Sequence, residues 1–83
     1  MYIHIGKNEI INNEEIICVL DYHIVHLSPK YKQFIKEKKD KIIWIDHKKN
    51  IKSIIITDKN IYYSPFSTRT IKKREDIYEK AIE

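Results

Sequence analysis

The chain has 83 residues, of which 34% are charged, and a formal net charge of +4. This length fits a single domain, 1–83, with a thin core, because a chain of this size buries only about 60–65% of its unfolded surface. Domains this small often depend on a disulfide, a metal or a partner subunit. Cys18 is the only cysteine, so an internal disulfide is excluded and a reducing compartment is expected.

The amino-terminal residues lack the basic and the long apolar regions of a signal peptide. The longest uncharged apolar run is far shorter than the roughly 18 residues that cross a bilayer. We therefore expect a cytoplasmic protein without a membrane partner.

Positive charge is concentrated in the middle of the chain. Residues 1–27 hold one lysine and four acidic residues, whereas residues 28–59 hold ten lysines and four acidic residues. Such a segment suits a phosphate backbone or an acidic protein surface. Lysine outnumbers arginine 14 to 2 and isoleucine occurs 19 times, a bias that an AT-rich genome also produces. Charge alone therefore leaves the ligand open.

The first half of the chain reads as short strands followed by a helix. The expected strands are residues 2–5, 9–11 and 16–21. Residues 12–15 read as a polar turn or a single helical turn. The pattern of residues 22–27 could go either way, and we treat this segment as a loop. Ser28 and Pro29 are typical of a helix start, as N-cap and first helical residue, and this helix is expected to reach about Lys38.

The second half is predicted to contain three more strands and a final helix. The expected strands are residues 41–45, 52–57 and 61–64. A polar loop covers 46–50, and residues 58–60 form a hairpin turn. Pro65 ends the last strand, and Ser67 caps a helix that extends to about Ala81.

This order predicts an α+β domain with a mainly antiparallel sheet of about five to six short strands, one central helix and one C-terminal helix. Residues 16–20, 42–43 and 54–56 are apolar at successive positions, so both sheet faces need cover. Two modest helices are not enough to cover both faces of the sheet. We expect a partner subunit to cover the apolar surface that the helices leave exposed.

The chain contains no convincing catalytic or metal-binding pattern. His23 and His26 lie three residues apart, but a structural zinc site needs four Cys or His ligands. Cys18 lies among apolar residues, where a thiol is usually inert. Asp46 and His47 are adjacent on a loop, where neighbouring side chains seldom face each other. We expect no enzyme, no cofactor and no small-molecule substrate.

The candidate binding residues are therefore basic. Lys48 and Lys49 lie on an exposed loop with Lys52 beside them, where long side chains reach phosphates without reading bases. Arg69 and Arg74 open the last helix, an unfavourable place for cations in the helix dipole, although nearby acids explain them equally well. Further lysines crowd the end of the first helix, namely Lys36, Lys38, Lys39 and Lys41.

Several stretches resemble the RemA/RemB family of extracellular matrix regulatory proteins. They are residues 1–6, 52–57, 61–67 with Tyr-Tyr-Ser-Pro, and 70–74, and the similarity spans essentially the whole chain. The resemblance implies a small bacterial regulator of biofilm-matrix genes with a LytTR-like fold, assembled into rings that DNA wraps. It also implies DNA contacts from the loop before 52–57, where this chain has Lys48 and Lys49.

Residues and resemblance together predict a homo-oligomeric transcriptional regulator that binds double-stranded DNA without strong sequence preference. Lys48 and Lys49 would contact phosphates, Lys52 would support them, and Arg69 or Arg74 would contribute secondarily. The alternative is a regulator that oligomerises or docks a partner protein without binding DNA. Glu15 favours this alternative, because the resemblance places a basic residue at or near that position.

Overall fold

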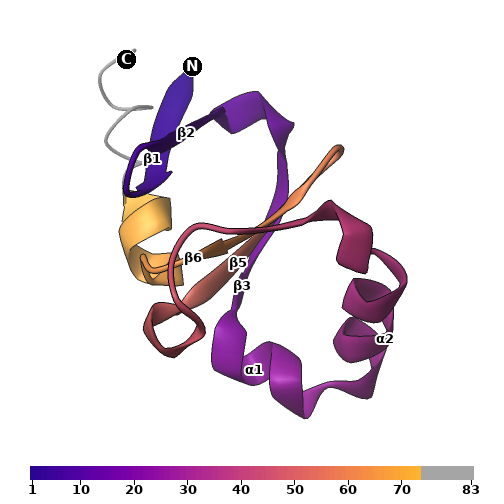
Figure 1. Ribbon diagram of the computed structural model, residues 1–83. Helices are drawn as coiled ribbons and strands as arrows, with labels where there is room; N and C mark the ends of the chain where they lie inside the picture. Colours follow the sequence, from indigo (N-terminus) through magenta and orange to yellow (C-terminus); the bar gives the residue numbers. More distant parts are fainter. Residues whose placement is uncertain (74–83) are drawn as a thin grey trace.

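The computed structural model describes residues 1–73 and gives an α+β domain with two sheets (Figure 1). The strands are β1 (Tyr2–Gly6), β2 (Glu9–Asn12), β3 (Ile16–Asp21), β4 (Ile42–Trp44), β5 (Ser53–Thr57) and β6 (Ile61–Ser64). The α-helices are α1 (Tyr22–Leu27) and α2 (Pro29–Glu37), and short 3-10 turns occupy Asn13–Glu15, Lys39–Lys41 and Lys48–Asn50. No helix within residues 1–73 has the length and apolar character needed to span a bilayer.

The larger sheet has the strand order β3-β5-β6-β4. β5 runs antiparallel to both β3 and β6, whereas β4 runs parallel to β6. The expectation of a mainly antiparallel sheet is confirmed for these strands. Among residues 1–73, β1 and β2 pair only with each other, as an antiparallel hairpin, and so they do not extend the larger sheet.

Both faces of the larger sheet carry a core. The first core lies under α1 and α2 and contains Tyr22, Val25, Ile51, Ile54, Ile56, Ile61 and Tyr63. The second contains Ile3, Ile5, Ile11, Ile55, Tyr62 and Ile71. Alternate side chains of β5 enter the two cores, so all five of its residues are buried. The β1–β2 hairpin covers the second face of the sheet with Ile3, Ile5 and Ile11. The prediction from the sequence counted only the two helices as cover and did not consider the hairpin.

Residues 22–27 form helix α1, so the expectation of a loop there is wrong. The Asp21 carboxylate caps the helix by accepting hydrogen bonds from the backbone N–H groups of His23, at 2.8 Å, and Ile24, at 3.2 Å. Tyr22 and Val25 bury one face at i, i+3 spacing. The sequence did not reveal this helix because six residues are too few for a helical period to show.

The helix starts at Ser28 and Ser67 agree with the sequence. Ser28 accepts a hydrogen bond from the Tyr31 N–H at 3.4 Å, with Pro29 as the first residue of α2. Ser67 accepts one from the Thr70 N–H at 3.1 Å, where a further helix begins over residues 68–73. The expected extension of that helix to Ala81 lies outside the described residues.

The hairpin is held closely against the rest of the domain at Gly6. Its φ is +141°, and a Cβ built there would lie 2.8 Å from Pro65 Cδ and 3.0 Å from Ile45 Cγ2. Only glycine combines this backbone angle with so close an approach. The buried Ser64 hydroxyl donates to the Ile5 carbonyl on the same strand as Gly6. These contacts fix the hairpin beside the loop that follows β4.

Candidate nucleic-acid interface

The loop between β4 and β5 is shaped by Asp46. Its Oδ1 accepts hydrogen bonds from the backbone N–H of His47, at 2.6 Å, and the side-chain amide of Asn50, at 3.2 Å. The Lys7 ammonium, on the β1–β2 turn, lies 3.4 Å from the same oxygen. The hydrogen bond from the His47 N–H lowers the pKa of the Asp46 carboxyl most, and the Asn50 amide and the Lys7 ammonium lower it further. Asp46 is therefore ionised at neutral pH.

Three candidate lysines extend from this loop into solvent. Lys48 and Lys49 lie on its 3-10 turn, and Lys52 lies just before β5; all three are exposed. The Lys52 backbone is fixed, because its N–H donates to the Ser64 carbonyl at 2.9 Å and its carbonyl accepts from the Tyr22 N–H at 3.0 Å. The structure therefore brings these three cations onto one anchored segment, Lys48–Lys52.

Arg69 belongs to a different surface. It is exposed on the last helix and lines a hollow of about 490 Å³ beside β3. The other lining residues are Asn13, Ile16, Ile17, Cys18, Val19, Thr68 and Lys72. Cys18 is partly buried there, and burial raises the pKa of its thiol. Arg74 lies outside the described residues.

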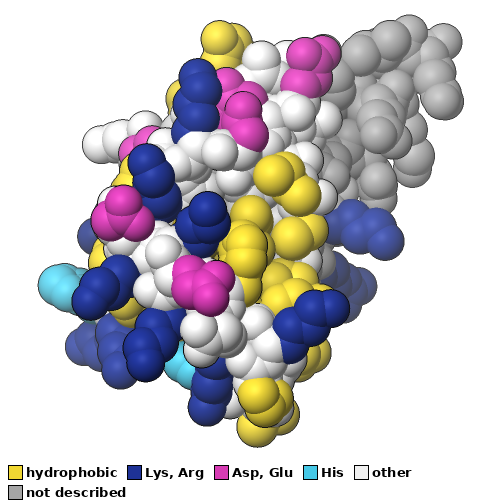
Figure 2. Space-filling view, turned by 90° about the vertical axis from the view of Figure 1, so that its right-hand side faces the viewer, with side chains coloured by type: hydrophobic (Ala, Val, Ile, Leu, Met, Phe, Trp, Pro, Cys, Tyr) yellow, Lys and Arg dark blue, Asp and Glu magenta, His cyan; other side chains and the backbone are white. Residues whose placement is uncertain are grey.

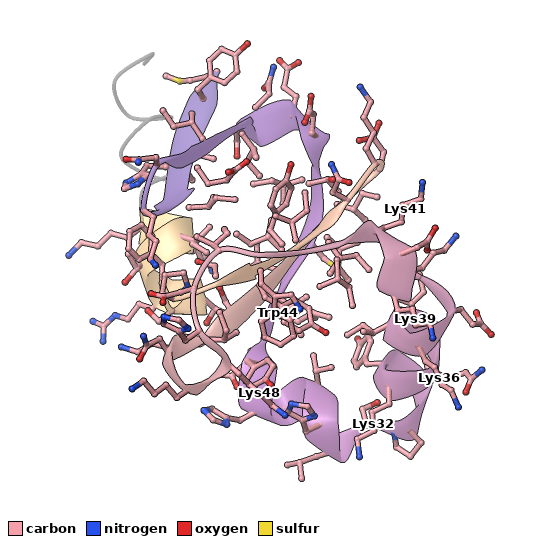
Figure 3. The ribbon with its side chains drawn as sticks, viewed as in Figure 1. Lys32, Lys36, Lys39, Lys41, Trp44 and Lys48 are labelled. Carbon is pink, nitrogen blue, oxygen red and sulfur yellow. The ribbon has the colours of Figure 1, made fainter. Side chains whose placement is uncertain are left out.

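A second group of lysines surrounds α2. Figure 3 shows Lys32, Lys36, Lys39 and Lys41 projecting from α2 and the turn after it, with Trp44 between them and Lys48 in this view. The Trp44 side chain is 48% exposed, although its ring packs against Tyr63 with 4.3 Å between centroids. The sequence reasoning noted the crowding of lysines but assigned it no role, and it overlooked Trp44.

The α2 side of the molecule also exposes apolar side chains. Figure 2 shows them as a band among lysines and acidic residues. Ile17 of β3 is 66% exposed and Phe34 of α2 is 38% exposed. They share a groove of about 270 Å³, which is also lined by Lys38, Lys41, Ile56, Thr57, Asp58, Lys59, Asn60 and Ile61. The groove thus combines apolar side chains with three lysines and one carboxylate, that of Asp58.

The described histidines and carboxylates do not gather into a metal site. Within residues 1–73, no group of three or more His, Cys, Asp or Glu side chains could hold a metal ion. His23 and His26 are both exposed on α1, where their rings pack against the ring of Tyr22.

The matches to known proteins cover the described domain and its basic loop. The family model for RemA-like proteins, described as extracellular matrix regulatory protein A-like, matches residues 2–74. The chain belongs to this family. It is also 38% identical over 74 residues to extracellular matrix regulatory protein B of Bacillus subtilis (strain 168), a match that covers 89% of each chain. The resemblance seen in the sequence is confirmed, and this RemA-like chain is a member of a regulator family.

Proposed function

We propose that this RemA-like chain is a non-enzymatic, cytoplasmic transcriptional regulator of extracellular-matrix (biofilm) genes that binds double-stranded DNA. The segment Lys48–Lys52 is the observation that carries the proposal, because it presents three exposed cations on an anchored backbone. An anchored loop loses little conformational freedom on binding. Lysine lacks the planar fork of arginine, so these residues neutralise phosphates without reading bases.

The proposal includes a homo-oligomer, with a LytTR-like DNA-binding mode and a closed ring as the expected assembly. β3 is an edge strand, and Ile17 projects from it into solvent. Monomeric proteins rarely leave contiguous apolar patches exposed, and strand edges invite pairing with another chain. An oligomer would also sum many weak phosphate contacts along one DNA molecule.

The first experiment measures binding to a fluorescent duplex of about 100 base pairs over a salt series, with the mass of the protein assembly recorded in parallel. A plot of log affinity against log salt concentration should fall with a slope of about 0.9 for each phosphate that the protein neutralises. The double variant Lys48→Glu with Lys49→Glu should bind much more weakly and show a shallower slope. The charge-matched control is Lys30→Glu with Lys39→Glu, two exposed lysines outside the loop. Equal losses in both double variants would remove the loop from the mechanism.

The groove lined by Ile17 and Phe34 favours a second candidate function, a regulator that docks a partner protein without binding DNA. Its apolar floor and its lysines suit an acidic protein segment with apolar side chains. Partners captured from a lysate with and without nuclease would separate the two functions. The second function would be favoured if the native chain does not bind duplex DNA at low salt and still captures a partner protein after nuclease treatment. The Ile17→Ser variant should then lose that partner.

A further inference from the structure

Four aromatic rings from α1, β4 and β6 form a connected row. The ring centroids are 4.5 Å apart for His26 and Tyr22, 5.8 Å for Tyr22 and Tyr63, and 4.3 Å for Tyr63 and Trp44, each pair packed edge to face. Tyr22 and Tyr63 are buried, whereas His26 and Trp44, at the two ends of the row, are exposed. The row therefore presents aromatic surface to solvent at both ends.

A hollow of about 230 Å³ opens beside this row. Its lining residues are Val25, His26, Lys32, Ile35, Lys36, Ile54 and Tyr63. Sites for drug-sized ligands have volumes of roughly 300–1,000 Å³, so this hollow suits a single planar ring system. Its floor is apolar and two of its walls are aromatic.

The charged groups at the hollow are both positive. Lys32 and Lys36 are separated by four residues on α2, so they lie on the same face of the helix and repel each other. Neither lies within ion-pair distance of a carboxylate among residues 1–73. An anionic group placed between their ammonium groups would relieve this repulsion.

We propose that the hollow binds a nucleoside phosphate, with its base against the rings of His26 and Tyr63 and its phosphate between Lys32 and Lys36. Aromatic side chains accept every base, because each base has a π-face. The bases of an intact duplex are stacked on each other and cannot enter such a hollow. The ligand is therefore a free nucleotide or an unstacked nucleotide of a single strand. This site is separate from the Lys48–Lys52 segment and does not depend on it.

Trp44 allows the proposal to be tested on the full chain without a label, because it is the only tryptophan and its ring packs against Tyr63, which lines the hollow. Its fluorescence would be followed during titration with adenosine monophosphate, guanosine monophosphate, adenosine, inorganic phosphate and a short single-stranded oligonucleotide. Calorimetry would provide a second readout that is free of nucleotide absorbance. We expect saturable binding of the nucleotides and binding about tenfold weaker for adenosine and for phosphate, since each retains only half of the contacts.

Two double variants separate the hollow from general charge effects. Lys32→Gln with Lys36→Gln should reduce nucleotide affinity by about tenfold through loss of the charge-assisted contacts. The control, Lys30→Gln with Lys39→Gln, removes the same charge from exposed positions that do not line the hollow. The loop variant Lys48→Glu with Lys49→Glu should bind nucleotides as the native chain does, so failure of duplex binding and failure of this site remain distinguishable.

Tighter binding of the oligonucleotide than of the monophosphates would identify the natural ligand as single-stranded nucleic acid, and the reverse order would identify a free nucleotide. The proposal is overturned if neither class gives saturable binding by fluorescence and calorimetry. It is equally overturned if the control double variant loses as much affinity as Lys32→Gln with Lys36→Gln.

Discussion

Lys7 and Asp46 form an ion pair that joins the β1–β2 turn to the loop carrying Lys48 and Lys49, with 3.4 Å between Nζ and Oδ1. The two partners differ in their surroundings. The Lys7 side chain is 57% exposed, whereas that of Asp46 is 14% exposed and also accepts hydrogen bonds from His47 and Asn50. The shape of the loop therefore depends more on Asp46 than on Lys7.

We expect Asp46→Ala to lower the thermal midpoint more than Lys7→Ala does. An exposed ion pair contributes little to stability, but the Asp46 change also removes the acceptor of two hydrogen bonds within the loop. DNA affinity should fall in Asp46→Ala despite the loss of a negative charge, because the lysines would sit on a looser backbone. Thermal unfolding and duplex binding of the two variants would test this. Equal midpoints, with tighter DNA binding by Asp46→Ala, would contradict it.

The same carboxylate predicts a pH dependence. The pKa of Asp46 is lowered in the folded protein, chiefly by the His47 N–H, so the folded chain releases this proton more readily than the unfolded chain. Asp46 thus contributes to stability at pH values above the ordinary pKa of aspartate, about 3.9. This contribution is lost as the pH falls through the lower pKa that Asp46 has in the folded protein. Urea unfolding of the native chain and of Asp46→Asn should differ at neutral pH and converge in acid. A difference that stays constant down to strongly acidic pH would contradict this assignment.

Gly6→Ala is expected to destabilise the domain by about 1–3 kcal/mol, the usual range for a residue held at an unfavourable backbone angle. The new Cβ would also press on the ring of Pro65 and on Ile45. The control is Asn8→Ala, which changes an exposed residue of the turn that follows Gly6. Chemical denaturation of the two variants would test this, and a Gly6→Ala chain as stable as the control would show that the hairpin can shift without penalty.

The sequence predicted the strands well because their signals are local. β3 and β5 are rich in isoleucine and β6 carries two tyrosines, and these strands end at polar residues, proline or a tight turn. The position of the hairpin was not predictable, because it depends on a contact between Gly6 and Pro65, 59 residues apart. The lysines of the Lys48–Lys52 segment could be picked out because they lie within five residues of one another in the sequence. The row of rings was missed because it joins α1, β4 and β6, which only the fold brings together.

Asp21→Ala should destabilise the domain by about 1 kcal/mol, as loss of an N-cap usually does. α1 is only six residues long, and its first free N–H groups, those of His23 and Ile24, depend on this carboxylate. Because α1 carries His26, nucleotide binding in the hollow should weaken as well. The matched control is Ser28→Ala, which removes the cap of α2. A stability loss without any change in nucleotide affinity would exclude α1 from the proposed site.

Tyr63 should ionise at a higher pH than a free tyrosine. Burial raises the pKa of its phenol, and the nearby Tyr22 phenol raises it further. The folded chain therefore holds this proton more tightly than the unfolded chain, so the contribution to stability is complete below about pH 10 and is lost as pH rises toward the folded value. Ultraviolet titration of phenolate should show this late step in the native chain and not in Tyr63→Phe. Tyr31→Phe, which changes an exposed ring on α2, should keep it. A late step that persists in Tyr63→Phe would assign the raised pKa to another tyrosine.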